Sequence, residues 1–218
     1  MKKYLISSSL TTDLTYADVR PKEPYVLKDE LCQHCPKCGA LSYGLKWVAP
    51  YKVAFNKKTI GDISLWSPLV VTQKFKDIYE QNNLTGIKDF YLVEQATSRG
   101  KEIDLKLYVV ELERTNGYVN YNKTKIKGGV TDIKKCACCN PIKREMAYVN
   151  GIYFDREFKF DIFYIYDWGD QIFLSEKFVK IMVANGITNL ESNIEECEKY
   201  IFPKWPKEDY EKAIKLRK

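Results

Sequence analysis

Six of the seven cysteines in this 218-residue chain lie in two short clusters that are far apart in the sequence. The first cluster, CQHCPKCG at 32–39, contains the pair Cys35 and Cys38, and the second, CACC at 136–139, contains the pair Cys136 and Cys139, each 101 residues after its counterpart. Two residues separate the thiols of each pair, a spacing at which one tight turn directs both sulfurs to the same ion. The four cysteines together therefore predict one structural Zn²⁺ site with tetrahedral coordination.

Three other side chains near the clusters are alternative ligands, namely Cys32, His34 and Cys138. The glycine that ends CPKCG favours the first pair, because it lets backbone amides turn toward the sulfurs without a Cβ clash. A redox function for the CxxC pairs requires a strand that leads into a helix at the cluster, and neither cluster has that pattern.

The residues required for catalysis are few in this sequence. A catalytic zinc keeps an open position and usually has His or carboxylate ligands beside a general base. The chain has a single histidine, and it contains neither a Walker loop nor a GxGxxG motif. We therefore expect a protein that is not an enzyme, with no catalytic residue and with zinc as a structural cofactor only.

The spacing of the two clusters recurs in the elements that follow them. Residues 69–87 align without a gap on residues 172–190, an offset of 103. In each copy a hydroxyl residue, Thr72 or Ser175, is suited to cap a helix with apolar positions at i, i+3 and i+4. The sequence therefore predicts a single domain of two divergent repeats, about 1–103 and 104–205, which the zinc site joins, and a C-terminal helix at 206–218.

The remaining segments are mostly typical of strands. We expect strands at 3–8, 88–95 and 105–113, and two strand pieces or an edge strand at 44–55, which Pro50 interrupts. We also expect a β-hairpin formed by 145–154 and 157–166, and a third helix near 194–201. This pattern predicts the α+β class, with antiparallel sheet and a few helices.

Composition and charge limit the possible partners. The content of 45% hydrophobic and 14% aromatic residues is sufficient for a sizeable core, and the apolar runs are too short for a membrane span or a signal peptide. Reduced thiols at metal spacing favour a cytoplasmic location. The net charge is +6, and residues 122–145 carry seven basic and two acidic side chains. A zinc-stapled nucleic-acid-binding protein that uses this basic segment is therefore one alternative.

The two CxxC pairs, combined with the stretch VVTQKFKDIYEQNNLTGIKDFYLVE at 70–94, resemble the double-CXXCG motif proteins, a paralogous family first noted in Myxococcus. The resemblance extends from Cys35 to about Leu190. Members of that family are associated with polymorphic toxin systems as immunity proteins, so the resemblance implies a bacterial protein that binds and neutralises a cognate toxin. The second cluster departs from the family pattern, because Asn140 stands where the motif has glycine.

Overall fold

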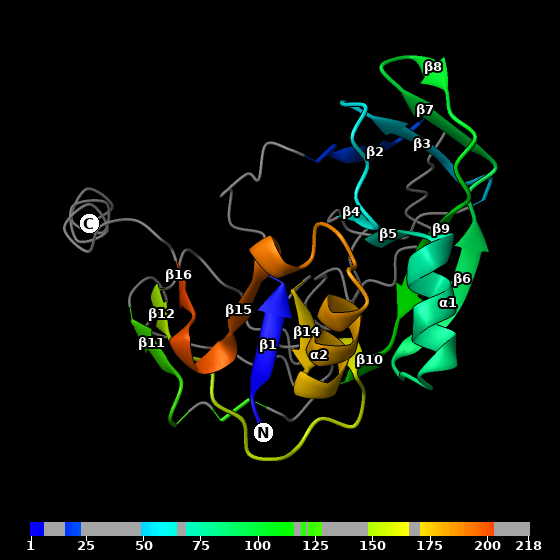
Figure 1. Ribbon diagram of the computed structural model, residues 1–218. Coiled ribbons are helices and arrows are strands. Elements are labelled where there is room, and N and C mark those ends of the chain that lie inside the picture. The colour runs from blue at the N-terminus through cyan, green and yellow to red at the C-terminus, as the bar shows by residue number, and fades with distance from the viewer. Residues whose placement is uncertain are drawn as a thin grey trace, which may run out of the picture.

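The computed structural model describes residues 1–6, 16–22, 49–64, 69–115, 119–120, 122–127, 148–165 and 171–202. Within these ranges the strands form four sheets, accompanied by two α-helices and two short 3₁₀ turns (Figure 1). Most of the strand pairs are antiparallel. The prediction of an α+β fold with antiparallel sheets and a few helices is therefore confirmed.

One sheet has four strands in the order β4–β5–β9–β6, and its neighbours are antiparallel. The strands are β4 (Ile63–Ser64), β5 (Leu69–Thr72), β6 (Ile87–Leu92) and β9 (Leu107–Leu112). Leu69 and Val71 of β5 face one core, whereas Val70 between them faces another. Because both faces of the sheet are covered, β5 is buried along its whole length.

The helix α1 (Gln73–Gln81) follows β5 directly. The Thr72 hydroxyl accepts a hydrogen bond from the Phe75 N–H and thereby satisfies one of the free donors of the first turn. Phe75, Ile78 and Tyr79 are the buried residues, at the spacing of one helical face. At the other end the Asn82 side chain donates to the Ile78 carbonyl. The predicted capped helix after Thr72 is confirmed.

The helix α2 (Glu176–Ala184) repeats this arrangement. The Ser175 hydroxyl accepts from the Phe178 N–H at 3.0 Å, and the Asn185 side chain donates to the Ile181 carbonyl. The buried face consists of Phe178, Val179 and Met182. The second predicted helix is therefore also confirmed.

The second large sheet has five strands in the order β10–β13–β14–β1–β15. They are β10 (Arg114–Thr115), β13 (Ile162–Ile165), β14 (Ile172–Ser175), β1 (Lys3–Ile6) and β15 (Ile194–Glu196). The order β13–β14–β1–β15 corresponds to β4–β5–β9–β6. Within these sets of four, β5 leads directly into α1 and β14 into α2. The first strands after the two helices are β6 and β15. We call β4, β5, α1 and β6 the first unit, and β13, β14, α2 and β15 the second unit.

One strand of each set of four, β9 or β1, comes from outside the unit. Val71 of β5 pairs with Tyr108 of β9, and Leu174 of β14 pairs with Tyr4 of β1, so the two tyrosines occupy matching positions. By the predicted boundary at 103/104, β1 belongs to the first repeat and β9 to the second. Under that predicted boundary, each strand would lie in the sheet of the other repeat.

Two small sheets cover the outer faces of the large ones. The first has the order β2–β3–β7–β8, with β2 (Val19–Pro21), β3 (Lys52–Phe55), β7 (Gln95–Ser98) and β8 (Lys101–Glu102). The second has the order β11–β12–β16, with β11 (Lys125–Lys127), β12 (Tyr148–Asn150) and β16 (Ile201–Phe202). Val53 of β3 packs in one core with Val109, and Val149 of β12 packs in another with Leu5.

The central core lies between the two large sheets and contains one buried face of each helix. Phe75 and Phe178 are both 0% exposed, and their ring centroids are 6.1 Å apart. The two units therefore share one hydrophobic core rather than enclosing separate ones.

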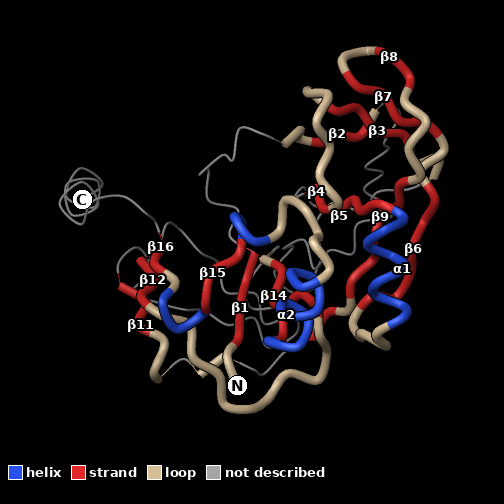
Figure 2. The backbone as a smooth tube through the Cα atoms, viewed as in Figure 1, coloured by secondary structure: helices blue, strands red, loops and turns tan. Residues whose placement is uncertain are grey.

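Two predicted elements are wrong. The third helix near 194–201 is instead β15 between two 3₁₀ turns, Glu191–Asn193 and Cys197–Lys199 (Figure 2). The edge of β1 offers backbone partners that a short isolated helix lacks, and Ile6 pairs there with Ile194. The predicted hairpin of 145–154 and 157–166 does not form, because β12 pairs with β11 and β16 whereas β13 pairs with β14 and β10. The predicted C-terminal helix at 206–218 lies outside the described residues.

Candidate functional site

The predicted zinc ligands Cys35, Cys38, Cys136 and Cys139 lie outside the described residues, as do the alternatives Cys32, His34 and Cys138. Cys197 is described and is fully buried, and this burial raises the pKa of its thiol well above the usual value. Within the described ranges no group of three or more His, Cys, Asp or Glu side chains is arranged to hold a metal ion. The zinc site therefore stays a prediction.

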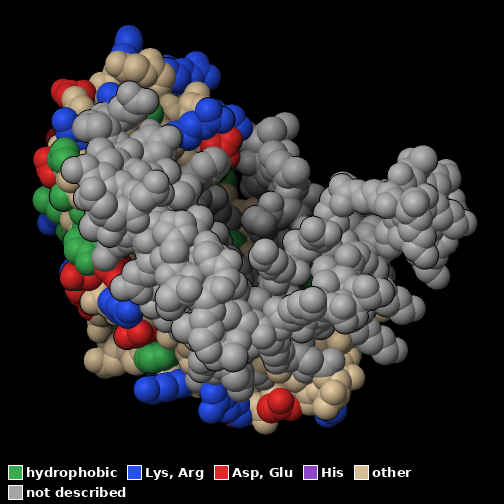
Figure 3. Space-filling model, turned by 180° about the vertical axis from the view of Figure 1, so that it is seen from behind, with side chains coloured by type: hydrophobic (Ala, Val, Ile, Leu, Met, Phe, Trp, Pro, Cys, Tyr) green, Lys and Arg blue, Asp and Glu red, His purple; other side chains and the backbone are tan. Residues whose placement is uncertain are grey.

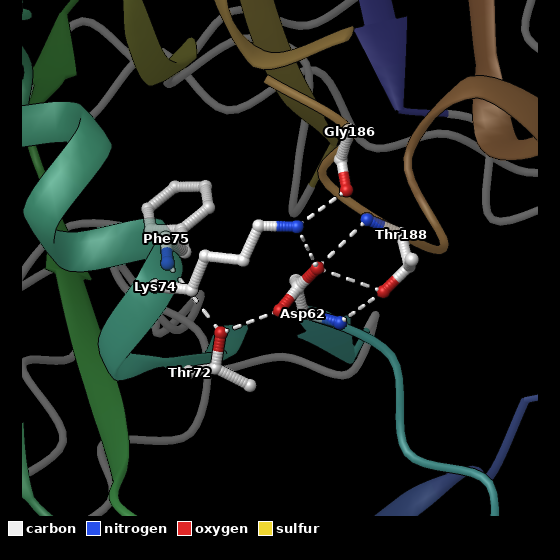
Figure 4. A network of polar contacts seen from close by, with 6 residues as sticks. All are labelled: Asp62, Thr72, Lys74, Phe75, Gly186 and Thr188. Carbon is white, nitrogen blue, oxygen red and sulfur yellow. Dashed lines mark hydrogen bonds and ion pairs between the residues drawn. The ribbon is translucent and has the colours of Figure 1, made fainter.

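Polar side chains of both units converge on Asp62, immediately before β4 (Figure 4). Its Oδ1 accepts a hydrogen bond of 2.8 Å from the hydroxyl of Thr72, the N-cap of α1. Its Oδ2 accepts from the N–H of Thr188 at 3.0 Å and from the Thr188 hydroxyl at 2.9 Å. The Asp62 N–H in turn donates to the Thr188 hydroxyl oxygen at 2.8 Å. One carboxylate thus links the start of α1 to the turn that follows α2.

Asp161, immediately before β13, makes the reciprocal link. Its Oδ1 accepts a hydrogen bond of 2.7 Å from the hydroxyl of Ser175, the N-cap of α2. Its Oδ2 accepts from the N–H of Thr85 at 3.0 Å and from the Thr85 hydroxyl at 3.1 Å. Thr85 follows α1, so each unit supplies a carboxylate to the other. We call these two networks the Asp62 latch and the Asp161 latch.

A lysine of each helix extends both latches. Lys74 of α1 donates to the Gly186 carbonyl at 2.6 Å and lies 3.3 Å from Asp62 Oδ2. Lys177 of α2 donates to the Asn83 carbonyl at 3.5 Å and lies 3.7 Å from Asp161 Oδ2. Both contacts of Lys74 are shorter than the matching contacts of Lys177, so the lysine is held more closely in the Asp62 latch.

The hydrogen bonds decide the ionisation of Asp62. Burial by itself would raise its pKa, but hydrogen bonds from the Thr188 N–H, from the Thr72 and Thr188 hydroxyls and from Lys74 outweigh that effect. The pKa of Asp62 is therefore held below its ordinary value. A carboxylate of this kind stays charged and bonded at neutral pH, which suits a permanent connection between the units.

Sequence comparison missed both carboxylates. They lie upstream of the segment that aligns without a gap. The two aspartates are 99 residues apart rather than 103, because four more residues separate Asp161 from β14 than separate Asp62 from β5. The signal that remains is an Asp-Ile pair, Asp62-Ile63 and Asp161-Ile162, ahead of each strand and helix. The capping residues Thr72 and Ser175, in contrast, were predicted, and they are the residues that the carboxylates contact.

Comparison with protein-family models and with curated proteins finds no match for this chain. In the described part of the chain, no helix has both the length and the apolar character that crossing a membrane requires.

Proposed function

We propose that the protein is a cytoplasmic immunity protein that binds and neutralises a cognate toxin of a bacterial polymorphic toxin system, without enzymatic activity of its own. The reciprocal latches between the units are the observation that supports this proposal. In these latches the carboxylates and hydroxyls between the two units are hydrogen-bonded to each other, which holds the units in one arrangement. A scaffold of this kind loses little conformational entropy on binding, which favours tight complexes. The resemblance of the CPKCG cluster and the α1 segment to double-CXXCG proteins supports the same function.

We further propose that the two units are divergent copies of one ancestral repeat, which a Zn²⁺ ion held by Cys35, Cys38, Cys136 and Cys139 ties together. The matching strand orders, helix caps and latches support the duplication. The zinc would add a third connection, because each repeat supplies one pair of thiolates. Such a site contributes directly to folding, since its ligands come together only in the folded chain.

The test of function is co-expression with the product of the gene directly upstream, where a toxin is normally encoded. We expect growth rescue and co-purification as a stable complex. Titrating the immunity protein against the toxin separates binding from catalysis, because a binder neutralises at equal amounts and an enzyme at a small fraction. The proposal fails if the protein neither rescues growth nor binds that product. If it then retains RNA or DNA through a low-salt column, the nucleic-acid alternative that uses residues 122–145 replaces it.

The test of the metal is elemental analysis, for which we expect about one zinc per chain. Cys38→Ser and Cys136→Ser should each remove the zinc and lower the free energy of unfolding. Cys197→Ala is the control: this residue is buried in a core, so its loss affects stability but should leave the zinc content unchanged. A folded chain without metal, with the thiols of both clusters open to labelling, would contradict the proposal.

A further inference from the structure

The small sheet that covers the first unit ends in two neighbouring turns. β3 ends at Phe55 and leads into the turn at 56–58, whereas β7 ends at Ser98 and leads through Arg99 and Gly100 into β8. β3 and β7 run parallel with Phe55 opposite Ser98, so both turns leave the sheet at the same end.

Hydrogen bonds hold these two turns together. The Ser98 hydroxyl donates to the Lys57 carbonyl at 2.6 Å, and the Arg99 N–H donates to the Phe55 carbonyl at 3.0 Å. On the β2 side the Asn56 side chain and Asp18 exchange two hydrogen bonds of 2.9 Å. The two turns therefore form one fixed end of the molecule rather than two independent loops.

This end carries a cluster of positive charge. Lys58, Arg99 and Lys101 are all exposed, and none of the three forms an ion pair with any carboxylate that the structure describes. Two acids nearby keep their charge but are bonded to neutral amides rather than to these three cations: Asp18 accepts a hydrogen bond from the Asn56 side chain, and Glu102 accepts one from Gln95 at 2.6 Å. Figure 3 shows Lys and Arg side chains gathered at this end of the molecule. We call Lys58, Arg99 and Lys101 the basic tip.

Arg99 lies in the exposed turn between β7 and β8. Arg99 has φ 49° and Gly100 has φ 80°, so the two-residue hairpin turn has positive φ at both positions. Asn, Asp or Gly is favoured at the first of these positions, and a positively charged residue that occupies it despite the unfavourable conformation suggests a use for its side chain. A Cβ built on Gly100 has no neighbour within 4 Å, so the turn projects into open space.

We propose that the basic tip is a docking surface for an acidic patch on a folded protein partner. The inference rests on the proposed function, in which that partner is the toxin. Nucleic-acid sites combine a long basic track with aromatic platforms for the bases. The tip instead has three charges on two turns that hydrogen bonds hold together, an arrangement that suits a compact group of carboxylates, and such complementary charges raise association rates and fix orientation.

The experiment compares two triple variants of the full chain. The tip variant carries Lys58→Gln, Arg99→Asn and Lys101→Gln, in which Asn suits the positive φ of the turn. The control variant carries Lys88→Gln, Lys180→Gln and Lys199→Gln, three lysines that are 44%, 73% and 74% exposed and lie in surface ion pairs. Each variant lowers the net charge from +6 to +3. A difference between them therefore does not arise from total charge.

The probes are poly-L-glutamate and a single-stranded oligothymidylate of about 20 nucleotides, each measured over a range of salt concentrations. We expect the tip variant to bind polyglutamate about tenfold more weakly than the parent, and the control variant to change by less than about threefold. Equal losses in the two variants would overturn the proposal. A greater loss of oligothymidylate binding in the tip variant would also overturn it, in favour of a nucleic-acid contact. Neither probe involves the toxin, so growth rescue by co-expression remains an independent test of the proposed function.

Discussion

The first and second units place their strands, helices, caps and carboxylates alike, but they differ in the small sheets that cover them. In the sheet over the first unit β3 and β7 run parallel, and its β7–β8 hairpin carries the basic tip. In the sheet over the second unit β12 and β16 are antiparallel, and the described part has three strands. The caps and latches occur in both units and hold the two units together. Among the described residues the basic tip occurs over the first unit alone, so we assign partner recognition to it.

The contacts between the units show why they are not independent. The latches cross reciprocally from each unit to the other, and both helices bury their apolar faces in one core. Strands from outside the units, β9 and β1, complete the two sheets. Equivalent substitutions in the two units should therefore have similar effects, and this expectation gives three ways to test the comparison.

The largest effect is expected for the two aromatic residues at the centre. Phe75→Ala and Phe178→Ala should each lower the free energy of unfolding by about 3–5 kcal/mol, because each leaves a cavity in the shared core. The rings are in contact, so the double variant should lose less than the sum of the single losses. Chemical denaturation measures both quantities. Leu92→Ala, at a residue that is 52% exposed, is the control and should change little. A small loss for one phenylalanine beside a large loss for the other would break the equivalence.

The next largest effect is expected at the latches. Asp62→Ala and Asp161→Ala should each cost about 2–3 kcal/mol, because each removes the acceptor of two hydroxyls and one backbone N–H. Asp77→Ala on the exposed face of α1 should cost far less. Equilibrium unfolding at neutral pH measures these values. A cost close to that of Asp77→Ala at either latch would show that it does not connect the units.

The lowered pKa of Asp62 adds a pH dependence. A carboxylate with a pKa lower in the folded state than in the unfolded state, where it is about 3.9, contributes its full stabilisation above that value. The contribution is lost as the pH falls through the folded pKa. Asp62→Asn should therefore destabilise the protein at pH 7 and make its stability less dependent on pH below about 4. Unfolding curves measured from neutral to acidic pH test this, and an unchanged acid dependence in the variant would contradict it.

The smallest effect is expected at the helix caps. Ser175→Ala should cost about 1–2 kcal/mol and Thr72→Ala somewhat less, because the N–H to hydroxyl distance is 3.0 Å at Ser175 and 3.4 Å at Thr72. The exchanges Ser175→Thr and Thr72→Ser keep the hydroxyl and should stay within about 0.5 kcal/mol of the parent. Thermal unfolding of the four variants measures the series. A reversed order for the alanine variants would contradict this ranking.

Local features of the sequence were sufficient to predict the two helices but not the junction between the units. Thr72 and Ser175 begin helices whose buried face follows the 3.6-residue period, and both signals lie within a few residues. β15 depends on the edge of β1, almost two hundred residues away, and its apolar spacing resembled a helix instead. The latches join Asp62 to Thr188 and Asp161 to Thr85, contacts that only the folded chain brings together. The cysteine clusters lie outside the described residues, and the predicted zinc site rests on the spacing of the cysteines.

Native-state hydrogen exchange on the full chain tests most directly whether the two units form one cooperative structure. The amides of β9 in the first sheet and of β1 in the second should open with the same free energy, because both sheets enclose one shared core. Phe178→Ala should then lower the protection of both sheets equally. If the amides of β5 and β6 keep their protection in that variant while those of β14 and β1 lose it, the units unfold separately and the account is contradicted.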